Sequence, residues 1–326
     1  MGSWEDGIRA GDAVACADAI DGQVSDGDIP FVRVPCSDGG HGLVVLLPDD
    51  ASQLSKLFSV VARMPPDDAG KSVLVEIDSQ RITPSFGIAD TGALGPAERE
   101  ERVTAIMGWL FGTTGIARES TGVMRLADQA VRILLRVPGA ALTDFPFLLI
   151  EEPVREAMIE LALGESEEDA WVASCLRQAS PEHVSALVWC LEAVLDLPML
   201  RHPLCLPHGV TDLCRMAEAG RTVFVLLPPP AFDRGLARSL LSEVATRQLA
   251  RLSLRPEAEH GTIPGYAAEA LAEDKEAFRQ NMLEILLASA PYMPRRDEVS
   301  KEDRRRRHIL MSDDRDAIMG LLSEGE

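Results

Sequence analysis

The stretch Gly42–Asp50, GLVVLLPDD, decides the fold class of this chain. Its successive branched apolar residues, preceded by glycine and followed by proline and aspartate, are typical of a buried strand in a parallel sheet. Two later runs have the same character, VLVEI at 73–77 and VFVLL at 223–227. Three such runs predict an α/β fold with a parallel sheet.

A helix is expected between the first two runs. Asp49 and Asp50 can cap its start, and Pro65–Pro66 end it. Its apolar face is formed by Leu54, Leu57, Phe58 and Val61. Strand, helix and strand within residues 42–96 predict a βαβ unit with a right-handed crossover. Residues 1–41 are rich in Gly and Asp and are expected to be an irregular lead-in containing one strand at 31–34.

Residues 97–208 change to helical periodicity and predict an all-α inserted domain. Its helices are expected at 98–111, 126–134, 153–163, 169–177 and 181–195, with a helical turn capped by Thr143–Asp144. Residues 209–255 return to the sheet with the third strand and a helix through Leu236, Leu240, Val244 and Leu252. Residues 256–326 are expected to form a helical tail with an amphipathic helix at 278–286 and a charged docking segment.

Composition narrows the classes of function. The chain has 326 residues, with 32 basic and 52 acidic side chains and a net charge of −20, which disfavours unassisted binding to a phosphate backbone. No apolar run reaches the roughly 18 residues of a membrane span. The acidic N-terminus lacks a signal core, so we expect a cytoplasmic protein. The six cysteines are far apart and are expected to be reduced thiols rather than a disulfide framework.

The sequence lacks a phosphate-binding loop. Hydrolysis of a nucleotide requires the motif G-x-x-x-x-G-K-[ST] between a strand and a helix. The nearest match, Gly70–Ser72, has Pro65 in place of the first glycine and runs into a strand instead of opening a helix. We therefore interpret it as an ordinary loop.

Four segments in order carry a resemblance to a known family. Gly42–Asp50 is similar to a strand ending in Asp-Pro-x-Gly-Asp, and Val73–Gly87 to the strand that follows it. Gly139–Arg155 is similar to a T-L-x-D-x-x-x-L-L-x-D-x-x-x-R segment, and Ala219–Leu241 to a return strand and helix. Over residues 42–255 the chain thus resembles the HerA/FtsK-like DNA-coupling ATPases of type IV secretion and conjugation. This resemblance implies a RecA-like parallel sheet, here incomplete, interrupted by an all-α insertion.

The chain departs from that family where the chemistry would be. The Walker A loop expected before residue 42 is missing, and Leu47 stands where the family has an aspartate. After Arg255 the family has a strand ending in Asp-Glu, whereas here Pro256–His260 is expected to lead into a helix. Without lysine, hydroxyl and acid, no group would neutralise a transferring phosphoryl group. Hexamer formation and DNA translocation are therefore not inferred.

His202, Cys205, His208 and Cys214 are candidate zinc ligands, because imidazole and thiolate at short spacing can surround tetrahedral Zn²⁺. The alternative is a buried loop, which the intervening apolar and proline residues favour.

Arg304, Arg305, Arg306 and Arg307 form the main basic cluster of the sequence. They could hold nucleic acid or an acidic partner. Since Glu302, Asp303, Asp313 and Asp314 flank them, a solvated and salt-bridged segment is the better interpretation. Nucleic-acid binding is expected only if it occurs through these arginines.

Two hypotheses follow from the sequence. In the first, the protein is a non-catalytic structural or interaction component of a larger protein assembly, without a cofactor. In the second, it is a nucleotide-binding or ATPase subunit whose phosphate site is completed by a partner chain. No nucleophile, acid or base that could serve an enzyme is identified.

Overall fold

The structure is a computed structural model. It describes residues 29–35, 41–48, 51–76, 83–85, 103–104, 106–108, 121–196, 198–208, 211–227, 259–263 and 275–324. Contacts between residues divide the chain into two compact units. We call residues 1–79 and 211–293 the sheet unit, and residues 80–210 and 294–326 the helical unit.

The sheet unit contains the three predicted parallel strands. They are β2 (His41–Pro48), β3 (Ser72–Glu76) and β4 (Thr222–Leu227), with β4 in the middle. Val44 of β2 and Val73 of β3 both pair with Val223 of β4, so the three apolar runs lie in register. The prediction of an α/β fold with a parallel sheet is confirmed for these strands.

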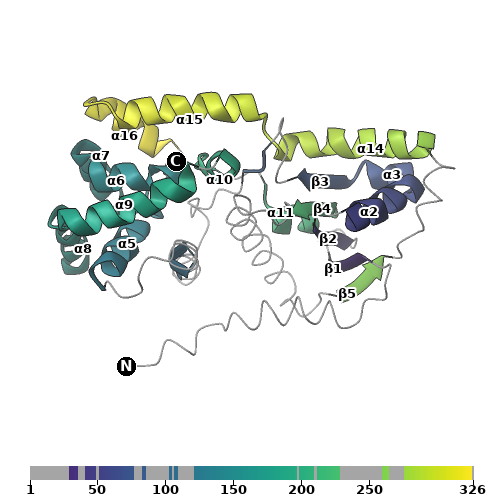
Figure 1. The fold of residues 1–326 in the computed structure, drawn as a ribbon, viewed down its shortest axis with the longest axis horizontal. Coiled ribbons are helices and arrows are strands. Elements are labelled where there is room, and N and C mark those ends of the chain that lie inside the picture. The colour runs from purple at the N-terminus through teal and green to yellow at the C-terminus, as the bar shows by residue number, and fades with distance from the viewer. Residues whose placement is uncertain are drawn as a thin grey trace. The chain divides into compact units, whose positions relative to one another are not determined.

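Two antiparallel strands complete the sheet in the order β3-β4-β2-β1-β5 (Figure 1). β1 (Ile29–Pro35) confirms the strand predicted at 31–34, and it pairs with β2 and with β5 (Glu259–Ile263). The sheet is therefore mixed, not purely parallel as predicted. The prediction that a helix follows directly after His260 is wrong. A five-residue segment without apolar periodicity becomes a strand here because the free edge of β1 pairs with its backbone.

Helices α2 (Ala51–Arg63) and α14 (Lys275–Ser289) pack on the sheet together with the short helix α3 (Pro66–Ala69). Their shared core joins Val45 and Phe224 of the sheet to Leu57 of α2 and Ile285 of α14, all almost completely buried. Asn281 of α14 donates hydrogen bonds to the carbonyl oxygens of Val61 and Met64, at 2.8 and 2.7 Å, and so satisfies the end of α2. α14 is thus a core helix of this unit, as Figure 1 shows.

Helix α11 (Leu213–Glu218) packs against β1, β2 and β4. The Asp212 side chain caps its start by accepting the N–H of Arg215 at 3.1 Å. Gly220, with φ of 73°, ends it and turns the chain into β4. β2 passes so close to α11 that a Cβ at Gly42 would lie 1.9 Å from the carbonyl oxygen of Ala217.

The helical unit follows the predicted pattern. α5 (Thr121–Leu134), α7 (Glu152–Ala162), α8 (Glu167–Arg177) and α9 (Pro181–Leu195) confirm four of the predicted helices. Residues 103–104 and 106–108, within the helix predicted at 98–111, are helical. The remaining elements are η1 (Leu142–Asp144), α6 (Phe145–Ile150), α10 (Pro198–Leu204), α15 (Arg296–Leu310) and α16 (Arg315–Ser323). The helix predicted through Leu236–Leu252 lies outside the described residues.

The residues predicted as one helical tail are shared between the units. α14 and the 3₁₀ turn η2 (Ala290–Tyr292) belong to the sheet unit, whereas α15 and α16 belong to the helical unit. In the part of the chain that the structure describes, no helix is long and apolar enough to cross a membrane.

We expect Gly42→Ala to destabilise the protein by about 2 kcal/mol or more, because the added methyl group would collide with the backbone of α11. A backbone atom, unlike a flexible side chain, cannot rotate out of the way. Urea unfolding measures this change. Gly320→Ala is the control, since nothing lies within 4 Å of its new methyl group. It should stabilise α16 by up to about 1 kcal/mol. Equal effects of the two variants would contradict the packing of β2 against α11.

Candidate functional site

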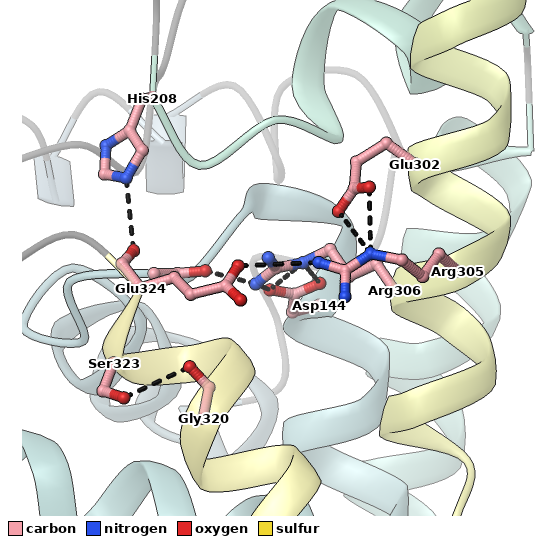
Figure 2. A network of polar contacts seen from close by, with 9 residues as sticks. Asp144, His208, Glu302, Arg305, Arg306, Gly320, Ser323 and Glu324 are labelled. Carbon is pink, nitrogen blue, oxygen red and sulfur yellow. Dashed lines mark hydrogen bonds and ion pairs between the residues drawn. The ribbon is translucent and has the colours of Figure 1, made fainter.

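The arginine-rich segment 304–307 lies on α15, and one of its arginines, Arg306, is buried. The Arg306 side chain is 3% exposed and that of Asp144 is 1% exposed. Arg306 Nε–H donates to both carboxylate oxygens of Asp144, at 2.8 and 3.0 Å, and Nη2 contacts Asp144 Oδ2 and the carbonyl oxygen of Gly139 (Figure 2). The guanidinium and the carboxylate therefore compensate each other inside the helical unit.

Asp144 has a second partner. Its Oδ2 accepts the backbone N–H of Ala141 at 2.7 Å, which fixes the turn that leads into η1. Asp144 occupies the N-cap position of α6 but makes no side-chain hydrogen bond to that helix. The predicted side-chain cap at Thr143–Asp144 is therefore wrong for α6, because the Asp144 carboxylate instead binds the N–H of Ala141, at the start of η1, and Arg306.

The other three arginines of the cluster are exposed. Arg305 pairs with Glu302 at 3.0 Å and with Glu324 at 3.5 Å (Figure 2). Hydrogen bonding to Glu302 raises the pKa of Arg305. The solvated, salt-bridged segment expected from the sequence describes Arg305, but not Arg306.

A second ion pair joins α10 to α15. Arg201 donates through Nε and Nη2 to the two carboxylate oxygens of Asp303, at 2.7 and 2.9 Å, and both side chains are largely buried. Burial lowers the pKa of Arg201, but hydrogen bonding and attraction to Asp303 outweigh it and raise the pKa overall. α15 therefore docks through two bidentate pairs one helical turn apart.

His202 fills the space beside this pair. Its Nδ1 accepts the Nε–H of Arg296 at 2.9 Å. Ser300 Oγ donates to the carbonyl oxygen of Arg296, so the contact of 3.0 Å between Ser300 Oγ and Nε2 is donated by the imidazole. These contacts assign a neutral imidazole with the proton on Nε2. Burial, followed by the positive charge of Arg296, lowers the pKa of His202.

The four predicted zinc ligands have other surroundings. Cys205 is buried, its thiol donates to the carbonyl oxygen of His202 at 3.4 Å, and burial raises its pKa to about 12. His208 is exposed and its Nε2 lies 3.2 Å from the carbonyl oxygen of Glu324. Cys214 lies on α11 in the sheet unit. Among the described residues, which include these four, no group of three or more His, Cys, Asp or Glu side chains could hold a metal ion.

The surface of the helical unit has an open hollow of about 520 Å³ beside α7. Glu152, Glu156 and Glu160 follow one another along α7, with Arg177 and Arg315 across from them. Glu156 binds Arg177, and Glu160 binds Arg315. The hydrogen bond from Arg177 lowers the pKa of Glu156. Two of the three carboxylates that line the hollow are therefore engaged in ion pairs.

Sequence reasoning missed the partners of Arg306 and of Asp303. Both residues share a helix face with Val299 and Leu310, at a spacing of i, i+4, i+7 and i+11, and all four are buried. This spacing was visible in the sequence and could have placed Asp303 and Arg306 inside. Comparison with protein-family models, curated proteins and solved structures found no match for the chain.

We expect Arg306→Met to lower the free energy of unfolding by about 3–5 kcal/mol, because it leaves the Asp144 carboxylate buried without its cation. Adding Asp144→Asn should recover part of this loss. The neighbouring Arg305→Met is the control, since its pair is exposed and should be worth less than about 1 kcal/mol. Chemical denaturation of the variants measures the difference, and similar losses for Arg305 and Arg306 would contradict the buried pair.

His202 should make the protein less stable in acid. The pKa of His202 is lowered in the folded state, so the unfolded chain takes up a proton first, near the ordinary value of 6.5. The stabilisation is complete above that value and decreases as the pH falls below it. Between about pH 7.5 and about pH 5.5 the wild type should lose about 1 kcal/mol more than His202→Asn, which keeps an acceptor for Arg296.

Urea unfolding at both pH values, with the exposed His208→Asn as the matched control, measures this dependence. An unchanged pH dependence in His202→Asn would show that the imidazole does not carry it.

Proposed function

We propose that the protein is a non-catalytic structural component of a larger protein assembly, built on a scaffold similar to that of the coupling ATPases. The parallel strands β2, β4 and β3 support the scaffold part of this proposal. The surroundings of Gly70–Ser72 support the loss of hydrolysis. Ser72 lies in β3, and its hydroxyl donates to the carbonyl oxygen of Asp68 at 2.8 Å, so it does not open a helix facing a phosphate.

The observation that carries the interaction role is the two-sided character of α14. Its inner side places Ile285 and Ser289 against the sheet, where the Ser289 hydroxyl accepts the N–H of Leu74 at 2.8 Å. Its outer side exposes three leucines, Leu283, Leu286 and Leu287, at 51%, 46% and 61%. We call these three residues the α14 leucine patch.

The leucine patch is contiguous because positions i, i+3 and i+4 are neighbours on a helix surface. Covering large apolar side chains with a partner would stabilise the complex by about 25 cal/mol for each Å² of apolar surface removed from water. Single exposed leucines are common, but three adjacent ones on a core helix mark a surface that another protein can cover. We infer that the patch contacts a second copy of the chain, because a patch on one helix can meet itself about a two-fold axis.

A nucleotide-binding role completed by a partner chain is the second candidate. It is favoured by the three parallel strands, whose carboxyl ends lie at the same edge of the sheet, where α/β proteins commonly bind nucleotides.

We expect the wild type to self-associate with increasing concentration in size exclusion with light scattering, and Leu283→Glu combined with Leu287→Glu to be monomeric. Charges on the patch would have to be buried without partners in the dimer. The control pair, Ile150→Glu and Trp171→Glu, replaces two exposed apolar residues of the helical unit and should leave association unchanged.

A wild type that stays monomeric throughout, or a control pair that also dissociates the protein, would contradict the role of the patch. Magnesium-dependent binding of ATP or GTP by the purified chain in the micromolar range would instead favour the nucleotide-binding candidate.

A further inference from the structure

The solvent side of α15 carries cations that its internal contacts do not use. The buried side of this helix consists of Val299, Asp303, Arg306 and Leu310. Roughly opposite lie Lys301, Arg304 and His308, with Arg307 at their flank, all exposed. We call these four residues the α15 basic face.

These charges are largely unpaired. Within the described residues, Lys301, Arg304 and Arg307 form no ion pair, whereas the adjacent Arg305 is paired with Glu302 and Glu324. The helix dipole favours cations in the last turn and accounts for Arg307 and His308. It does not account for Lys301 and Arg304, because the effect falls off within that turn. Three free cations on one helix are notable in a chain with a net charge of −20.

An apolar side chain adjoins the basic face. Met311 follows Arg304 by seven residues and Arg307 by four, so it lies on the same side of the chain at the end of α15, and it is 65% exposed. A flexible thioether next to guanidinium groups suits a protein ligand that has both acidic and apolar side chains. From Lys301 to Met311 the helix rises about 15 Å, which equals the reach of about five extended residues.

We propose that the α15 basic face binds a short acidic segment of a partner protein, with carboxylates on Arg304 and Arg307 and an apolar side chain on Met311. Nucleic acid fits less well. The face contains no Phe, Tyr or Trp on which a base could stack, and the net charge of −20 repels an extended polyanion over the rest of the surface. A short acidic segment would experience mainly the local cations, because salt screens charges beyond about 8 Å.

This inference rests on the proposed interaction role but uses a different helix from the leucine patch. The two can therefore fail separately, since self-association is measured without a ligand and the binding described below is measured in the patch variant as well as in the wild type.

The experiment uses the full chain and a fluorescein-labelled dodecapeptide of alternating glutamate and leucine as the probe, followed by fluorescence anisotropy at several salt concentrations. The wild type should bind it, with an affinity that falls as salt rises. Arg304→Glu combined with Arg307→Glu should weaken binding by about tenfold or more. Arg125→Glu combined with Lys275→Glu makes the same change of net charge at exposed positions outside α15 and should bind like the wild type. Leu283→Glu combined with Leu287→Glu should also bind the peptide.

Unfolding curves of each variant establish that it is folded, and Met311→Ser, which leaves all charges in place, should weaken binding by a smaller factor. The proposal is overturned if the wild type does not bind the peptide, if the two charge-reversal variants lose affinity equally, or if a labelled single-stranded oligonucleotide binds more tightly than the peptide at the same salt concentration.

Discussion

The helical unit depends on the buried ion pair between Arg306 and Asp144. An isolated charge in this position would cost several kcal/mol, so each side chain is tolerated only because the other is present. Asp144 also holds the N–H of Ala141, and Arg306 also holds the carbonyl oxygen of Gly139. This pair thus ties the segment between α5 and α6 to α15, although Asp144 and Arg306 are 162 residues apart in the chain. The pair is better understood as a device that selects one docking of α15 than as a large source of stability.

This docking explains how charges are distributed on α15. The side that faces the unit contains Asp303 and Arg306, each of which meets an opposite charge, and the ends of this side are apolar. On the outer side, Arg305 pairs with Glu302 and Glu324, whereas Lys301, Arg304 and Arg307 form no ion pair with any described residue. The same helix therefore carries buried, paired charges on one side and solvated charges on the other. An arginine run that looks uniform in the sequence is divided by the helical period into a buried part and a solvated part.

α14 makes a similar division with apolar residues. Ile285 and its neighbours complete the core on β3 and α2, while the leucine patch faces solvent on the other side. Among the described residues, three polar groups singled out above make structural contacts: the Ser72 hydroxyl bonds the carbonyl oxygen of Asp68, His202 lies between Arg296 and Ser300, and Cys205 is a buried thiol with a pKa of about 12.

The sequence alone determined the parallel strands and most helices of the inserted region, because apolar runs and the 3.6-residue period are local properties that depend on neighbouring residues. Thus VLVEI and VFVLL were recognisable as strands, and the proline and glycine residues that bound the helices could be read directly. Only the tertiary structure determined strand pairing, the division into units and the burial of charged side chains, because these depend on residues distant in the sequence. β5 forms because the free edge of β1 pairs with it. α14 and α15 belong to different units. Arg306 is buried because Asp144 supplies the opposite charge. The segment 202–208 shows the same limit: its spacing is compatible with a metal, but His202 contacts Arg296 and Ser300 of α15, and the Cys205 thiol donates to a backbone carbonyl oxygen. Such pairings are settled by which side chains meet in space, and residues more than a hundred positions apart leave no periodic trace in the sequence.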